Sequence, residues 1–231
     1  MKTENKIAIG ISSVLVAIGI LLFLWVLPLI FTWLAFGTSY ENRTNEISYL
    51  KKAINCSIFK WQKLYTLENI LPSLLLAEKY DEAIMYFERM EKDNIETSTS
   101  KFLVIDAYIK LKKYDKALQL AKEIDNQYKL ARIYIDTNDL DNAKKAVEKL
   151  FSTKKKVPNA YLYVAEIQLK EGYPKSALQS IDKLLTINPK HVDALEVKAK
   201  IYENLGQKTN AEVHYLKAKQ IRDERKQKLG L

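Results

Sequence analysis

The sequence has few of the residues that end helices and strands. Its 231 residues include 6 Gly and 5 Pro, whereas average usage of about 7% would give roughly 16 Gly. Folds built from many short strands need turn residues at regular intervals, so this scarcity excludes a sandwich, a barrel or a propeller. Hydrophobic residues make up 48% of the chain. Long helices are therefore the expected structure, in one globular domain with an appendage.

Residues that carry chemistry are also scarce. The single cysteine, Cys56, excludes a disulfide framework and a cysteine-based zinc site. The two histidines, His191 and His214, belong to no metal-ligand motif. The sequence has no phosphate-binding glycine loop, no HExxH motif and no nucleophile elbow. We predict that the protein is not an enzyme and that it has no cofactor, metal or catalytic residues.

Arginine is rare in a chain that is basic overall. Lys and Arg number 37 against 28 Asp and Glu, for a formal charge of +9, but only five of the 37 are Arg. Arg supplies the planar fork that reads bases and binds phosphates, so nucleic acid is not an expected partner. The cations after Lys217 are interpreted as the solvated cap of the last helix. Attraction of this tail to anionic lipid or nucleic acid is a remote alternative.

Charge is absent from one long run, Ile7 to Phe36. A helix of this length reaches ~45 Å, against about 30 Å for the hydrocarbon core of a bilayer. It predicts a single transmembrane helix, which either tilts or is divided by Pro28 into a main span and a short interfacial turn. A cleaved signal peptide is the alternative, although its apolar region is usually shorter. We assign residues 1–6 to a polar tail and residues 7–37 to the anchor.

The flanks of this anchor do not fix its orientation. Lys2 and Lys6 precede it, and Arg43, Lys51 and Lys52 follow it, so the numbers of cations on the two sides are similar. A short tail before a span and a large domain after it favour a domain outside the cytoplasm. The opposite orientation remains open.

A repeated phrase marks the rest of the chain. The phrase consists of an aromatic or apolar residue, a short break and then an alanine within an apolar helix, as in Lys79-Tyr80-Asp81-Glu82-Ala83. The five alanines are Ala83, Ala117, Ala143, Ala177 and Ala211, with spacings of 34, 26, 34 and 34 residues. Such regular spacing indicates stacked helical repeats, which bury their apolar faces only against one another.

This 34-residue period resembles the tetratricopeptide repeat, an antiparallel helix pair that stacks into a right-handed solenoid. Gly172, Ala177 and Pro189 occupy the family's Gly, Ala and Pro positions, and the next unit supplies Gly206 and Ala211. The first two units keep the alanine but lack the glycine and the closing proline. The third is eight residues short, so we expect the helix around Lys116–Ile124 to run almost directly into the helix around Tyr128–Ile135.

The resemblance implies an all-α chain, with one N-terminal transmembrane helix followed by an α-solenoid of about five such helix pairs. Residues 64–221 form the solenoid, with units starting near 64, 98, 124, 158 and 192. Residues 38–63 form a helical collar that packs on the first repeat, and residues 222–231 form a basic tail. Pro72 falls within the expected first helix, which we expect to be kinked or to begin late.

In this family the first helix of each pair lines a concave groove that binds protein partners. Carried onto this sequence, the groove positions form a hypothetical protein-binding site of nine residues: Phe102, Asp106, Ile109, Tyr128, Arg132, Ile135, Leu162, Glu166 and Leu169. The apolar run from Phe102 to Ile109 is expected to be covered, either by the collar or by a partner's apolar segment.

Resemblance to anchored bacterial proteins of this family implies a membrane location, in the bacterial inner membrane. We predict a scaffold or adaptor that binds one or more membrane-associated proteins through its groove and supports assembly of a membrane complex. A permanent, non-catalytic accessory subunit of such a complex is the alternative.

Overall fold

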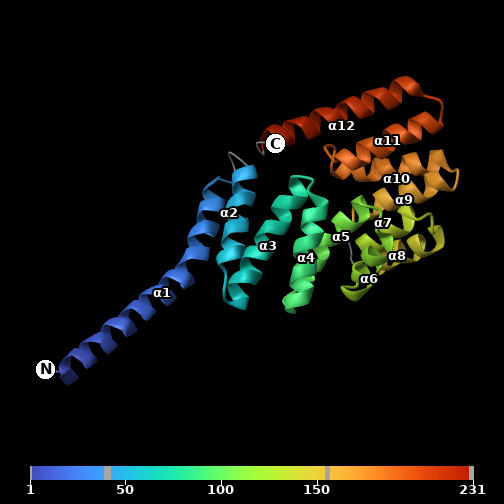
Figure 1. Ribbon diagram of the computed structural model, residues 1–231. Helices are drawn as coiled ribbons and strands as arrows, with labels where there is room; N and C mark the ends of the chain where they lie inside the picture. Colours follow the sequence, from blue (N-terminus) through green and yellow to red (C-terminus); the bar gives the residue numbers. More distant parts are fainter. Residues whose placement is uncertain (1, 39–42, 154–156, 229–231) are drawn as a thin grey trace. The chain divides into compact units, whose positions relative to one another are not determined.

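The computed structural model describes residues 2–38, 43–153 and 157–228, with side chains for 18–37, 44–152 and 157–227. Met1, the start of the expected collar and the last three residues of the expected tail lie outside this set. All regular structure in the described residues is helical, and it comprises twelve helices (Figure 1). The chain divides into two units, a first that extends to Ala107 and a second that begins at Tyr108.

The first unit holds the apolar N-terminal helix, the collar and the first helix pair. Its helices are α1 (Lys2–Thr38), α2 (Arg43–Cys56), α3 (Lys60–Leu76), α4 (Tyr80–Asp93) and most of α5 (Ser98–Lys110). The second unit follows from the last turn of α5. Its helices are α6 (Tyr114–Glu123), α7 (Gln127–Asp136), α8 (Leu140–Thr153), α9 (Ala160–Lys170), α10 (Pro174–Ile187), α11 (Val192–Asn204) and α12 (Lys208–Lys228).

The five helix pairs α3–α4, α5–α6, α7–α8, α9–α10 and α11–α12 share one type of turn. The fifteenth residue of each expected repeat has a positive φ: Glu78 (58°), Lys112 (58°), Asn138 (61°), Gly172 (83°) and Gly206 (74°). The N–H of the following residue donates to a carbonyl five residues earlier, at 2.8 Å in all five turns, as from Tyr173 to Gln168. This left-handed helix ending is the Schellman motif, which favours glycine. The first three turns therefore keep the conformation without glycine, the residue that adopts it most readily.

We expect Lys112→Gly to raise the free energy of unfolding of the second unit by about 0.5–1 kcal/mol. Left-handed backbone costs an L-residue about 1–2 kcal/mol, which exceeds the extra entropy of about 0.5–1 kcal/mol that glycine loses on folding. Gly172→Ala, at the same position two repeats later, should lower stability by a similar amount. Urea unfolding followed by far-ultraviolet circular dichroism checks both signs, and a loss of stability in Lys112→Gly would contradict this account.

The repeated alanines lie in the tightest part of the packing. Ala83, Ala117, Ala143 and Ala177 have no exposed surface, and Ala211 is 3% exposed. In the second unit Ala177 packs with Ile181, Leu184, Ala194 and Val197, which belong to α10 and to the first helix of the next pair. A small side chain lets these helices approach closely, and stacking of neighbouring pairs completes the core.

Two expectations about helix boundaries can be compared with the structure. Only residues 124–126 separate α6 from α7, which agrees with the near-continuous path expected for the short third unit. The first helix of the first pair does not begin late. Helix α3 starts at Lys60, before residue 64, the expected start of the first repeat, and it includes Pro72. The side chain of Gln62 fixes this start, because its Oε1 accepts a hydrogen bond from the Phe59 N–H (3.3 Å).

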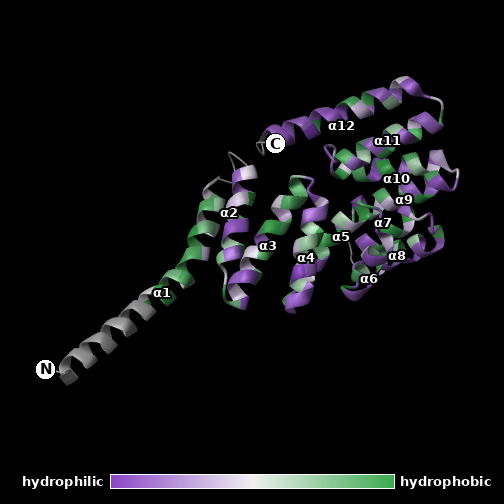
Figure 2. Cartoon of the chain, viewed as in Figure 1, coloured by the Kyte–Doolittle hydropathy of each residue, from purple (hydrophilic) through white to green (hydrophobic). Residues whose placement is uncertain are grey.

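The apolar helix α1 and the collar pack on each other within the first unit. The collar helix α2 contacts both α1 and α3, and the Ser73 hydroxyl of α3 donates to buried Glu46 of α2 (2.7 Å). In α1, the segment Ile18–Gly37 has the length and composition of a membrane span or of a signal sequence. It is strongly hydrophobic, in contrast to the hydrophilic end of α12 (Figure 2).

Candidate protein-binding surface

The first helices of successive pairs lie against each other in the second unit. Helix α7 contacts α9, and α9 contacts α11, so these three helices form one continuous layer. Residues at the same repeat position therefore become neighbours across the layer. Arg132 on α7, Glu166 on α9 and Lys200 on α11 are such a series, since each is 34 residues from the next.

Arg132 and Glu166 form a largely buried ion pair on this layer, with two contacts between the guanidinium and the carboxylate. Arg132 Nη1 donates to Glu166 Oε1 (3.0 Å), and Nη2 lies 2.8 Å from Oε2. The side chains are 27% and 16% exposed. Oε2 is close enough for ionic attraction but has no well-aligned hydrogen bond. The pair thus has the forked geometry that favours Arg over Lys, with one carboxylate oxygen incompletely satisfied.

Aromatic rings and a second carboxylate surround the Arg132 guanidinium. Its Cζ atom lies 5.2 Å from the centre of the Tyr163 ring, within the range of a cation–π interaction. The Tyr128 and Tyr163 rings are 6.2 Å apart and tilted by 52°. Asp136, one turn along α7, accepts a long hydrogen bond from Arg132 Nη1 (3.5 Å). The guanidinium is therefore fixed from three sides.

The pKa values of the pair follow from burial and mutual attraction. Burial raises the pKa of Glu166, and the charge and hydrogen bond of Arg132 only partly oppose this effect. Burial lowers the pKa of Arg132, but Glu166 outweighs it, and the pKa is raised overall. Arg132 stays charged at any ordinary pH, whereas Glu166 takes up a proton more readily than an exposed glutamate.

The structure separates the nine expected site residues into three groups. Tyr128, Arg132, Glu166 and Leu169 lie together on the α7–α9 layer and are all partly exposed. Ile135 and Leu162 are only 2% and 6% exposed, and Leu162 belongs to the core formed with α10 and α11. These two are packing residues, because their side chains point between the stacked helices. Repeat position alone did not distinguish the two cases.

The third group lies on α5. Phe102 is 41% exposed, Asp106 is exposed and Ile109 is half-buried, while Val104, Ile105, Ala107 and Tyr108 between them are buried. The unit boundary falls between Ala107 and Tyr108, so Phe102 and Asp106 belong to the first unit. The surface described above is therefore limited to α7, α9 and α11.

Tyr163 and Asp136 belong to this surface but were absent from the expected set. The pairing of Arg132 with Glu166 was also missed, although the sequence carries a signal for it. Opposite charges exactly one repeat apart, at a position known to face the groove, predict an ion pair between neighbouring helices. The sequence carries no comparable signal for Tyr163, which has no charge to pair with a residue one repeat away.

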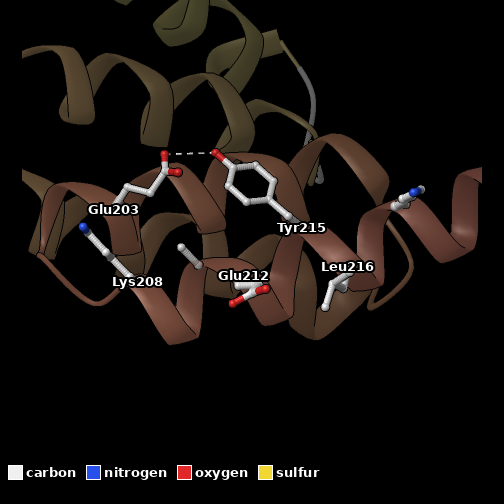
Figure 3. A pocket seen from close by; sticks show the side chains of 7 residues that line it. Glu203, Lys208, Glu212, Tyr215 and Leu216 are labelled. Atoms are coloured by element: carbon white, nitrogen blue, oxygen red, sulfur yellow. Dashed lines mark hydrogen bonds between the residues drawn. The ribbon is translucent and has the colours of Figure 1, made fainter.

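A hollow of about 550 Å³ lies at the end of the second unit, on α11 and α12. Its lining includes Ala211, Glu212 and Lys219, and Tyr215 donates to Glu203 there (3.0 Å) (Figure 3). One repeat earlier, the counterparts of Glu212, Tyr215 and Lys219 are Leu178, Ile181 and Leu185, which pack in the core. Polar replacements at these positions suit the open end of a stack, where no further pair covers the helix.

The basic tail is partly engaged by its own unit. Arg222 forms an ion pair with Glu196 of α11, and Arg225 Nη2 donates to the Lys190 carbonyl (3.0 Å). Ala218 and Ile221 of the same helix pack with Val192 and Leu195. These contacts give the start of the tail a role in closing the stack.

The candidate chemical residues have local roles. His191 caps α11, because its Nδ1 accepts from the Ala194 N–H (3.3 Å), and the His214 ring packs 5.3 Å from the Tyr202 ring. Among the residues with described side chains, no group of three or more His, Cys, Asp or Glu is placed to hold a metal ion.

Comparisons with known proteins agree with this architecture. Residues 136–218 match the family model described as anaphase-promoting complex, cyclosome, subunit 3. No match is found among curated proteins. A tetratricopeptide repeat protein from Parabacteroides merdae is similar in structure, with a TM-score of 0.61 and 18% identity over 74% of this chain and 70% of that one.

A second solved structure gives the same result. The thermophilic tetratricopeptide protein TTC0263 from Thermus thermophilus has a TM-score of 0.60 and 17% identity, over 73% of this chain and all of its own length (100%). Identities this low inform on fold alone. With the 34-residue period and the five Schellman turns, they show that the chain has a tetratricopeptide-repeat fold.

Proposed function

We propose that the protein is a membrane-anchored scaffold that binds a protein partner on the α7–α9 layer and supports assembly of a membrane-associated complex. The observation that carries the proposal is the partly exposed row of Tyr128, Arg132, Glu166 and Leu169 on two directly contacting helices. Aromatic, guanidinium and aliphatic groups of this kind dominate the energetics of protein interfaces. Anchoring would raise the local concentration of the scaffold near membrane-bound partners.

The Arg132–Glu166 pair favours a protein over a polyanion as the partner. Arg132 already faces two carboxylates, Glu166 and Asp136, so its positive charge is matched within the protein and is not free to attract phosphate. A polypeptide segment offers apolar side chains for Tyr128 and Leu169, together with backbone groups that can hydrogen-bond at the rim of the ion pair.

Photo-crosslinking from Tyr128 and Leu169 in native membranes tests this proposal. A photoreactive amino acid at either position should give adducts with another protein, and the same group at exposed Lys145 or Gln179 on the second helices should not. Leu162 is unsuitable as a crosslinking position because it is buried.

The pattern of adducts separates the outcomes. Several substoichiometric adducts support a transient scaffold, whereas one stoichiometric adduct that survives purification supports a permanent accessory subunit. Equal adduct yields from the two pairs of positions would show that the α7–α9 layer is not the binding surface.

A further inference from the structure

The two halves of α1 have different surroundings. From Ile18 to Phe23 the side chains of α1 are exposed, with Leu21 at 58% and Phe23 at 60%. After Trp25, one face of the helix is covered, and Thr32 and Ala35 are 2% and 0% exposed. The change follows from helix α2, which packs against α1.

Helix α2 runs back along the second half of α1 as far as Trp25. It starts five residues after Thr38, and its 14 residues match the length of residues 25–38. At the other end, the Gln62 side chain at the start of α3 donates to the Trp25 carbonyl (2.8 Å). The Trp25 and Trp61 rings also meet edge to face, with centres 6.3 Å apart. The start of α3 is thus held at the level of Trp25.

Helix α2 is too polar to lie in hydrocarbon. It carries Glu46, Lys51 and Lys52, and Lys51 forms an ion pair with Glu82 of α4 (2.5 Å). Because α2 accompanies residues 25–38 of α1, a bilayer that enclosed this part of α1 would also enclose these charges, which is unfavourable. The second half of α1, residues 25–38, is therefore unsuited to lie in the hydrocarbon core.

An exposed apolar corner lies where α2 meets α3. Its members are 42–50% exposed although all are large and apolar or aromatic: Ile58 (50%), Phe59 (42%), Trp61 (47%) and Tyr65 (45%). Lys60 is exposed beside them. Tryptophan and tyrosine favour the boundary between headgroups and acyl chains, and lysine favours anionic headgroups. The corner has this composition at the level where α1 loses its covering helix.

We propose that the α2–α3 corner docks into the surface of the bilayer that α1 enters, with the Trp25–Trp61 pair at the headgroup level. The crossing segment is then Ile7–Leu24, whose length of about 27 Å matches a hydrocarbon core of about 30 Å. A tilted span turns the exposed stripe of Val26, Ile30 and Trp33 toward the headgroups. The inference rests on the membrane anchoring proposed above and adds its register and a second contact.

Spin labels at single cysteines measure this register in the full-length chain. In a Cys56→Ser background, labels at Leu21, Phe59, Lys52 and Lys145 are compared in liposomes of phosphatidylethanolamine and phosphatidylglycerol. Collision with oxygen reports depth in the bilayer, and collision with a water-soluble nickel chelate reports exposure to water. We expect loss of nickel collisions at Leu21, partial loss at Phe59 and no loss at Lys52 or at the Lys145 control.

Each other pattern has its own meaning. Full nickel access at Leu21 would remove the membrane anchoring and this inference together. Loss at Leu21 with full access at Phe59 would keep the anchor and overturn the docked corner. Loss at Lys52 as well would assign the span to Ile18–Gly37 and overturn the proposed register. Quenching of Trp61 by brominated lipid, in a Trp25→Phe, Trp33→Phe background, provides a second depth measurement that needs no label.

Discussion

Arg132→Met lowers the free energy of unfolding of the second unit by about 2–4 kcal/mol. Removing one partner of a buried ion pair typically costs about 3–5 kcal/mol because the remaining charge is left without compensation, and the partial exposure of both side chains reduces that range. In the variant, Glu166 keeps its burial but loses the guanidinium. The double variant Arg132→Met, Glu166→Leu should recover most of the loss, because no charge remains buried.

The deficit of Arg132→Met should shrink at acidic pH. Burial already raises the pKa of Glu166 in the native protein, and removing Arg132 raises that pKa further. A carboxyl group with a raised folded pKa contributes its full stability below the unfolded pKa of about 4.3 and loses it as the pH rises through the folded value. The variant and the native protein should therefore differ least near pH 4, and the difference should grow as the pH rises through the raised pKa of Glu166 in the variant.

Hydrogen exchange of amides in α7 and α9 is the appropriate measurement. The three tryptophans, Trp25, Trp33 and Trp61, all lie in the first unit, so their fluorescence does not report unfolding of the second unit directly. An equal deficit at pH 4 and pH 7 would show that Arg132 acts through packing on Tyr163 and not through its charge.

Phe87→Ala should destabilise the first unit by about 3–5 kcal/mol, the range for truncating a buried aromatic residue. Phe87 has no exposed surface and is among the largest fully buried side chains. Urea unfolding followed by tryptophan fluorescence measures the loss in this unit. Met85→Ala on the same helix is the control, because Met85 is 52% exposed and its truncation should change stability by less than about 0.5 kcal/mol.

The same variant tests how far the two units depend on each other. Repeat stacks are stabilised mainly by contacts between neighbouring pairs. Amide protection in α10 and α11 should therefore remain close to that of the native protein in Phe87→Ala. A parallel loss of protection in both units would show that they unfold as one cooperative structure.

The fold was predictable because its signals are periodic. Five alanines at a nearly constant spacing were sufficient to predict the helix pairs, and the 26-residue interval predicted the short connection between α6 and α7. Surface and core were harder to separate in the first helices. Leu162 and Leu169 are identical in type and seven residues apart on one helix, yet the first is buried by α10 and α11 and the second is partly exposed.

The division of α1 was not predictable from hydropathy. Leucine, isoleucine and alanine are equally suited to lipid and to a neighbouring helix, so the sequence did not show that Thr32 and Ala35 pack against protein. Pro28 suggested that α1 is divided into two parts, but its position did not show which part packs against another helix. The polar helix α2 supplied that information only through its packing.

The chemistry of the five Schellman turns implies a gradient of resilience along the chain. The last two pairs place glycine at the left-handed position, the middle pair has asparagine, and the first two have glutamate and lysine. Each non-glycine turn carries a local conformational penalty of about 1 kcal/mol. Brief opening events should consequently be most frequent in the repeats that follow α1 and α2 and rarest in the last two repeats. A protease added to the native protein would then cut first near Glu78 and Lys112, and the repeat stack would survive longest at the end farthest along the sequence from the proposed membrane contact.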